Sequence, residues 1–278
     1  MGKQWHNRKP NHKQHRYSKT FTERYHEEEE ERLSEEQGRD MKEEVIEAIM
    51  NRACTDRLYN RLDSKQKQVY HAIVGKDKEV IFMNCKAGTG KTLIMIMGGL
   101  ELIRLRIVTG IDYIRVPTSR GERLGYTKGT TAEKEAKYMT PVYDALTECG
   151  ISPYHIPILQ NMGIINLSSD VSLRGCNLRK RVVIFDEAQS ADMEDQKLIY
   201  TRVHDGGGKL LIAGHSGQVD SKVQRISGLL PFEVFQMHGE GIPWIGQYTL
   251  TTNYRGKISQ WADNVDKTIK ELRGEGIC

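Results

Sequence analysis

The sequence has no long apolar run and no obvious cross-linking pattern. No apolar stretch approaches the roughly 20 residues that a membrane helix needs, and the charged, His-rich N-terminus lacks the apolar core of a secretion signal. The five cysteines are scattered, without a C-x-x-C pair or a histidine at ligand spacing, which argues against a disulfide framework and a zinc site. We therefore expect a cytoplasmic protein without membrane association.

The charge of the chain also lacks a strong bias. Its formal net charge is +4 and its pI is about 8.7, which is less basic than a dedicated nucleic-acid-binding domain. A hydrophobic content of 38% and a mean hydropathy of -0.58 fit a soluble protein with extra polar segments. The 278 residues suffice for a full hydrophobic core.

The N-terminal segment has almost no aliphatic residues. Residues 1–26 are rich in Lys, Arg and His, and residues 27–31 form an acidic block. Such a segment buries too little apolar area to offset its ordering entropy, so we expect residues 1–39 to be a disordered arm. The arm either contacts nucleic-acid phosphates or is simply solvated. Residues 40–278 are expected to form one domain, with a helical lead-in over 40–78 and a nucleotide-binding core over 79–278.

Residues 79–92 join an apolar run to a glycine-rich loop. The run predicts a strand, and the apolar residues after the loop predict a helix that begins near Lys91. Small residues let backbone N–H groups converge on a triphosphate, and the helix adds its positive dipole end. Lys91 is placed to reach the outer phosphates and Thr92 to ligate Mg²⁺. The predicted phosphate-binding residues are Lys86, Ala87, Gly88, Thr89, Gly90, Lys91 and Thr92.

Cys85 departs from the usual phosphate-loop pattern. In G-x-x-x-x-G-K-[ST], the first glycine falls where this chain has Cys85. One hypothesis is that the thiol, near a helix N-terminus and Lys86, is acidified and redox-sensitive. The alternative is a small side chain that the loop tolerates.

A second apolar run ends in two carboxylates. Residues 181–185 are apolar on both faces after Arg181, as in a central parallel strand, and Asp186 and Glu187 follow. Asp186 is predicted to hold Mg²⁺ through water, and Glu187 to polarise the water that attacks the terminal phosphate. Gln218, after a further strand at 209–213, is a candidate sensor of hydrolysis. Gln66 is a candidate adenine contact, although a glutamine on an exposed helix face is common.

Basic residues gather after the strand predicted at 112–116. The carboxyl ends of parallel strands face ligands, so these residues form either a phosphodiester track or a solvated basic loop. The candidates for nucleic-acid contact are Arg115, Arg120, Arg123, Lys128 and Arg174.

Hydrophobic periodicity predicts the remaining elements. Helices are expected from residue 40, from Ser64 and over 131–149, and strands over 164–167 and 247–250. A last helix is expected to bury the apolar residues Ile258, Trp261, Val265, Ile269 and Leu272.

These motifs, taken in order, resemble the first RecA-like domain of superfamily 1 helicases and, more narrowly, the PhoH-like ATPase family. The broader resemblance rests on Gln66, the loop 87–92, Asp186-Glu187-Ala188-Gln189, residues 214–218 and Asn253-Tyr254-Arg255. The narrower one rests on residues 121–126, 141–146, 173–175 and 201–202. It covers roughly residues 58 to 256. His215 departs from it, because the family's Gly-Asp-x-x-Gln pattern has aspartate there.

The resemblance implies an α/β, RecA-like P-loop fold with a mainly parallel central sheet flanked by helices. It further implies ATP hydrolysis with Mg²⁺, association with single-stranded RNA or DNA, and Arg255 as the cation that stabilises the transition state. The chain continues only a short way past Arg255, so we expect no second RecA-like domain in it. A neighbouring subunit is then expected to close the ATP site in a cyclic homo-oligomer, and the family favours a hexamer.

Three other functions stay open from the residues alone. A regulatory module would use the nucleotide only to switch its shape. A ribonuclease or ribonuclease partner would need a nuclease-like domain, and a small-molecule kinase a lid with arginines; neither feature is evident.

Overall fold

The computed structural model describes two units of the chain, Met1–Val45 and Ile46–Cys278, and the site lies in the second. The described residues are 29, 32–33, 39–40, 43–50, 55–115, 131–168, 178–204, 206–217 and 223–273. Most of the expected arm over 1–39 therefore lies outside them. The helix expected from residue 40 is confirmed over residues 43–50.

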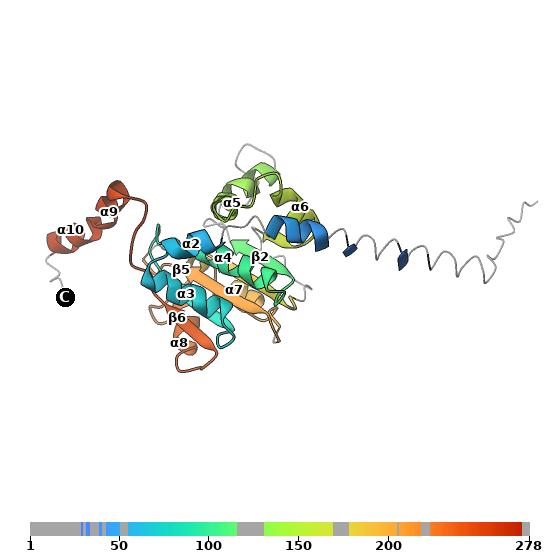
Figure 1. Cartoon of the computed structure of the whole chain (residues 1–278). Coiled ribbons are helices and arrows are strands. Elements are labelled where there is room, and N and C mark those ends of the chain that lie inside the picture. Colours follow the sequence, from blue (N-terminus) through green and yellow to red (C-terminus); the bar gives the residue numbers. More distant parts are fainter. Residues whose placement is uncertain are drawn as a thin grey trace, which may run out of the picture. The chain divides into compact units, whose positions relative to one another are not determined.

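A parallel sheet forms the centre of the second unit (Figure 1). Its strand order is β3-β2-β4-β5-β1-β6, and every neighbouring pair runs parallel. All carboxyl ends therefore meet at one edge, where ligands of such sheets bind. The strands are β1 (Val80–Asn84), β2 (Gly110–Arg115), β3 (Ile165–Ser168), β4 (Arg181–Asp186), β5 (Lys209–Gly214) and β6 (Ile245–Tyr248).

Helices cover both faces of this sheet, so the expected α/β fold class is confirmed. The α4 helix packs on β2, β4 and β5, with α3 and α5 against it, while α7 packs against α8. The α-helices that follow residues 43–50 are α2 (Thr55–Arg61), α3 (Ser64–Val74), α4 (Lys91–Arg104), α5 (Thr131–Glu148), α6 (Ile156–Asn161), α7 (Met193–Tyr200), α8 (Pro231–His238), α9 (Lys257–Asp263) and α10 (Val265–Leu272). None of them is both long and apolar enough to cross a membrane.

The close approach of α4 to its neighbours depends on two glycines. A Cβ added to Gly98 would lie 2.5 Å from Ile73 of α3, and one added to Gly99 would lie 2.8 Å from Ile111 of β2. Apolar side chains fill the interface on both sides, and the α4 positions that meet the sheet are fully buried. The helix that carries Lys91 and Thr92 is thereby held firmly over the sheet.

Three local expectations differ from the structure. The last strand is β6 over Ile245–Tyr248, two residues earlier than expected. The helix α6 was not expected in the stretch 151–180. The C-terminal helix is divided into α9 and α10, and its apolar residues are exposed rather than buried: Trp261 is 77% exposed and Leu272 83%. Helical spacing identifies an apolar face, but it does not show whether the same chain covers that face.

Candidate nucleotide site

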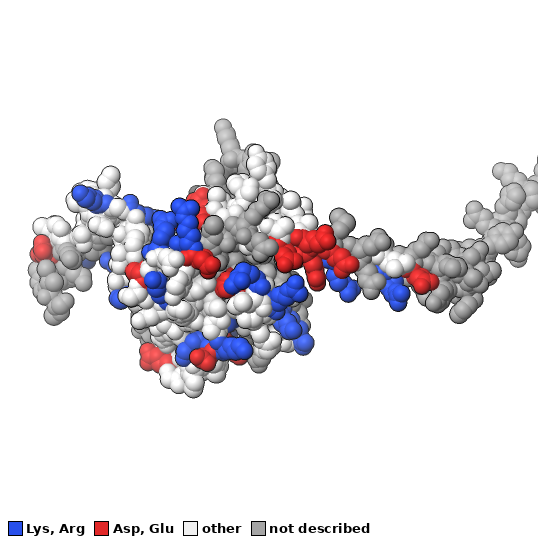
Figure 2. Space-filling view, viewed as in Figure 1, with Lys and Arg blue, Asp and Glu red and all other residues white. Residues whose placement is uncertain are grey.

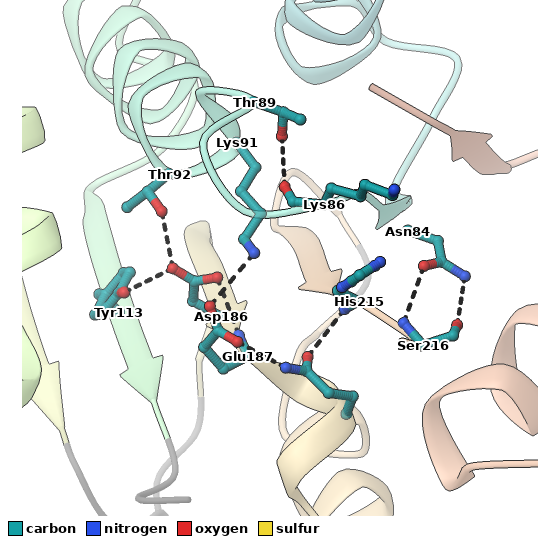
Figure 3. Close-up of polar contacts among 11 residues, drawn as sticks. Asn84, Lys86, Thr89, Lys91, Thr92, Tyr113, Asp186, Glu187, His215 and Ser216 are labelled. Atoms are coloured by element: carbon teal, nitrogen blue, oxygen red, sulfur yellow. Dashed lines mark hydrogen bonds and ion pairs between the residues drawn. The ribbon is translucent and has the colours of Figure 1, made fainter. Parts of the chain in front are cut away.

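The loop after β1 has the backbone shape of an anion-binding turn. Gly88 and Gly90 have φ angles of +76° and +80°, and Gly90 is the N-cap residue from which α4 begins. The Thr89 hydroxyl donates to the Lys86 carbonyl at 3.0 Å and closes the loop (Figure 3). The first N–H groups of a helix have no partner within it, so this end of α4 can receive a phosphate.

Lys91 and Glu187 form an ion pair at the mouth of this loop. The Lys91 Nζ lies 3.3 Å from Glu187 Oε1, and the two side chains are only 8% and 18% exposed. Burial raises the pKa of Glu187, but the charge of Lys91 and a hydrogen bond from Gln189 outweigh burial, and the net pKa is lowered. Glu187 also has a φ of +56°, a strained conformation for a residue with a side chain. The carboxylate is therefore ionised at neutral pH and held in a fixed position.

Asp186 lies under the start of α4 and is buried (Figure 3). Its Oδ2 accepts hydrogen bonds from the Thr92 hydroxyl at 2.9 Å and the Tyr113 hydroxyl at 2.8 Å. Its Oδ1 accepts the backbone N–H of Glu187 at 3.0 Å. The structure thus brings together the two side chains predicted to bind metal, Thr92 and Asp186.

The donors at this position suit Mg²⁺. No group of three or more His, Cys, Asp or Glu side chains in the described part of the chain is placed to hold a metal ion. Mg²⁺ does not need such a group in nucleotide sites, because it takes most of its ligands from phosphate oxygens and water. A hydroxyl and a carboxylate beside a phosphate loop are sufficient protein ligands.

Gln189 joins the acidic strand to the loop that follows β5. Its Nε2 donates to Glu187 Oε2 at 2.7 Å, and its Oε1 accepts the backbone N–H of His215 at 3.1 Å. A second link to the same loop comes from Asn84, which donates to Ser216 Oγ at 2.7 Å. The predicted sensor Gln218 lies just outside the described residues, and its role stays a prediction.

The segment 253–255 lies against the glycine loop. The backbone N–H of Tyr254 donates to the Gly88 carbonyl at 2.8 Å, and that of Arg255 to Asn253 Oδ1 at 2.8 Å. A Cβ on Gly88 would be 3.0 Å from Arg255 Cγ. The structure therefore brings Arg255, far away in sequence, to the loop that would hold the phosphates.

Gln66 also contacts this loop, from the start of α3. Its Nε2 donates to the Thr89 carbonyl at 3.0 Å, and its Oε1 accepts the N–H of Asp63 in a capping box. One N–H and one lone pair of the amide remain for another partner. Tyr254 extends this edge, because its hydroxyl donates to Asp63 Oδ2 at 2.6 Å. The adenine contact of Gln66 stays a prediction.

Arg115 is the one residue of the predicted nucleic-acid track that lies within the described residues. It pairs in register with Asp186, and its charge helps to lower the pKa of Glu187. On the described part of the face in Figure 2, Lys and Arg side chains form separate groups interspersed with Asp and Glu. Arg120, Arg123, Lys128 and Arg174 lie outside the described residues, so the track stays a prediction.

The hypothesis that the Cys85 thiol is acidified is wrong. Cys85 is 1% exposed, and burial raises the pKa of its thiol despite the charge of Lys91 and a bond from the Leu250 N–H, 3.1 Å from its sulfur. Its sulfur is buried between the end of β1 and the chain after β6. Cys85 is a packing residue.

Sequence reasoning did not identify Tyr113, Gln189 or Asn84 as parts of the site. Gln189 stood within the quoted Asp-Glu-Ala-Gln stretch, so its position next to Glu187 was a usable signal. Tyr113 and Asn84 looked like ordinary strand residues, and only the sheet register places them here.

A family model described as "PhoH-like protein" matches residues 14–263 of the chain. A PhoH-like protein of Mycobacterium leprae is 35% identical over 150 residues, which cover 54% of this chain and 42% of that protein. A PhoH-like protein of Bacillus subtilis is 32% identical over 154 residues, which cover 55% of this chain and 48% of that protein. The matched region is thus less than half the length of these relatives.

A matching solved structure is more distant in sequence. The crystal structure of Pif1 helicase from Candida albicans is 17% identical and has a TM-score of 0.35, with 74% of this chain and 43% of that chain covered. A likeness of this degree carries no argument about function. The family model matches most of the sequence, and the chain therefore belongs to the PhoH-like protein family.

Proposed function

We propose that the protein is a Mg²⁺-dependent ATPase that acts on nucleic acid, as a PhoH-like, helicase-type enzyme. The main support is the convergence of Lys91, Thr92, Asp186 and Glu187 on one glycine loop, within hydrogen-bonding or ion-pair distance of one another. Phosphoryl transfer consists mainly of positioning and charge neutralisation, and these are the groups that it requires.

Phosphate would compete with Glu187 for Lys91. The ammonium group now pairs with the Glu187 carboxylate at 3.3 Å, and it can turn to a phosphate oxygen in the loop. Glu187 then retains its bond from Gln189 and is available to orient a water and accept its proton.

Thr92 and Asp186 would hold the metal ion. When bound, Mg²⁺ would supply positive charge to the phosphate oxygens. The Thr92 oxygen could bind the ion through a lone pair while its hydroxyl still donates a hydrogen bond to Asp186 Oδ2. Asp186 can accept a hydrogen bond from a metal-bound water with its remaining lone pair.

Three further residues complete the proposed mechanism. Arg255 would stabilise the transition state; such arginines are worth on the order of 10³ to 10⁵ in rate, or roughly 4 to 7 kcal/mol. Gln218 would sense the terminal phosphate, and Gln66 would contact adenine. The closeness of the segment 253–255 to Gly88 supports the role of Arg255.

Nucleic acid and a neighbouring subunit are the proposed partners. Single-stranded RNA or DNA would contact the basic residues after β2, and a cyclic homo-oligomer would place a second subunit beside each ATP site. The alternative is a regulatory nucleic-acid-binding protein that nucleotide switches without processive helicase activity.

Turnover and binding together test the proposal. We expect ATPase activity to rise with single-stranded RNA or DNA and to respond to salt, since phosphate contacts are salt-dependent. Glu187→Gln should abolish turnover but keep ATP binding, whereas the exposed Glu240→Gln should match the wild type. A wild-type protein that binds ATP without turnover, with or without nucleic acid, would favour the regulatory alternative.

A further inference from the structure

Tyr113 is a fully buried tyrosine whose hydroxyl reaches the acidic end of the neighbouring strand. Its ring is packed within the sheet layer under α4, and its hydroxyl donates to Asp186 Oδ2 at 2.8 Å. We propose that Tyr113 is a positioning residue of the metal site, which holds the Asp186 carboxylate in the orientation that receives Mg²⁺. This inference rests on the proposed function and adds to it a residue that touches neither nucleotide nor metal.

The register of the sheet explains why a tyrosine is needed. Tyr113 of β2 is paired with Ile184 of β4, and Arg115 is paired with Asp186. Tyr113 and Asp186 thus point to the same face, two residues apart along the strand direction, a separation of about 7 Å. A phenol that leans along the strand spans this distance, whereas an aliphatic side chain or phenylalanine brings no donor to the carboxylate.

The Asp186 carboxylate accepts hydrogen bonds at most of its lone-pair positions. Oδ2 accepts from Thr92 and Tyr113, and Oδ1 accepts from the backbone of Glu187. About one of the four lone-pair positions of the carboxylate then remains, and it can face a metal-bound water. The Tyr113 bond therefore fixes both the rotation of the carboxylate and which oxygen position stays open.

The Tyr113 hydroxyl is the donor of its bond to Asp186, because a carboxylate oxygen can only accept. Without it, the single proton of the Thr92 hydroxyl would have to orient Oδ2 alone.

The test is Tyr113→Phe in the full chain. Binding of a fluorescent ATP analogue is measured across a Mg²⁺ series and in EDTA, and ATP turnover is measured against free Mg²⁺ at saturating ATP. We expect the Mg²⁺ concentration for half-maximal binding to rise about 10- to 100-fold, as for other groups that orient a metal ligand. Binding of the analogue in EDTA should not change, because Lys91 and the loop are untouched.

Tyr200→Phe is the matched control. Tyr200 also donates to a side chain, Gln196 Oε1 at 3.0 Å, but lies on α7, on the other face of the sheet. It should lose stability without any change in Mg²⁺ dependence. Tyr113→Met, which retains apolar bulk without the hydroxyl, replaces Tyr113→Phe if that variant does not fold.

Two results would overturn the inference. One is wild-type Mg²⁺ dependence in the Tyr113 variant; the other is an equal loss of analogue binding with and without the metal. Both leave the proposed ATPase intact if the wild type binds nucleotide in a Mg²⁺-dependent way. A wild type whose nucleotide binding ignores Mg²⁺ would refute the metal site and this inference together.

Discussion

Gly88→Ala tests whether the segment 253–255 really closes on the phosphate loop. The added Cβ would lie 2.6 Å from Asn253 Oδ1 and 3.0 Å from Arg255 Cγ. Asn253 cannot turn aside freely, because its Oδ1 accepts the N–H of Arg255 and its Nδ2 donates to Ser259, both at 2.8 Å. The clash is relieved only if the segment moves away from the loop.

The chain offers an unusually close control. Gly241 has the same φ angle of +76°, but a Cβ there would meet nothing within 4 Å. Alanine costs about 1–2 kcal/mol at either position through backbone strain alone. We expect Gly88→Ala to cost about 1–3 kcal/mol more than Gly241→Ala, the usual range for overpacking.

Two measurements separate these contributions. Urea denaturation gives the free energy of unfolding of both variants, and limited trypsin digestion reports cleavage after Arg255. If the segment stays docked under strain, Gly88→Ala should be less stable than Gly241→Ala. If the segment moves away, Gly88→Ala should be cut faster after Arg255. If both variants behave alike in both assays, the segment does not contact the loop, and the role proposed for Arg255 loses its support.

Two other variants test the buried charges. Lys91→Met should destabilise the apo protein by about 1–3 kcal/mol at pH 7, and less as the pH falls towards 4.5. In the wild type, the lowered pKa of Glu187 contributes stability above pH 4.5 that is lost in acid. In Lys91→Met, burial raises the pKa of Glu187, so the ionised carboxylate destabilises the folded protein at neutral pH. The pH-dependent difference should vanish in a Glu187→Gln background. Arg181→Met, which leaves Asp112 buried without its ion pair, should cost about 3–5 kcal/mol in urea unfolding. Arg225→Met, at the longer and more exposed pair with Glu233, should cost less than about 1 kcal/mol, and equal losses would contradict the assigned burial.

The strands and the phosphate loop were predictable because their signals are local. The apolar runs at 81–83, 182–185 and 210–213 are buried on both faces, and a parallel strand flanked by helices requires that pattern. The order strand, glycines, Lys91 and helix is likewise contiguous. Thr92 and Asp186 could each be assigned to Mg²⁺ from their own motifs, and the hydroxyl–carboxylate bond of 2.9 Å between them fits that prediction.

Features that depend on register or on distant partners were not predictable. Tyr113 follows the alternation of β2 like any core residue, and its contact with Asp186 exists only because β2 and β4 pair in one particular register. Sequence alone could not decide between the two alternatives for Cys85, because a motif position does not reveal burial, and burial raises the pKa of its thiol. The exposure of the apolar residues of α9 and α10 was not predictable either, because helical spacing does not show whether the chain covers an apolar face.

The ion pair between Lys91 and Glu187 also bears on how Glu187 would act as a base. Lys91 pairs with Glu187, and its charge helps to lower the pKa of this largely buried acid. A bound phosphate would draw Lys91 away and add negative charge nearby, and both changes raise the pKa of Glu187, whereas the charge of the proposed Mg²⁺ at Thr92 and Asp186 would lower it. Under the proposed function, nucleotide binding would thus release Glu187 from its pair with Lys91 and leave the carboxylate available to accept a proton from water.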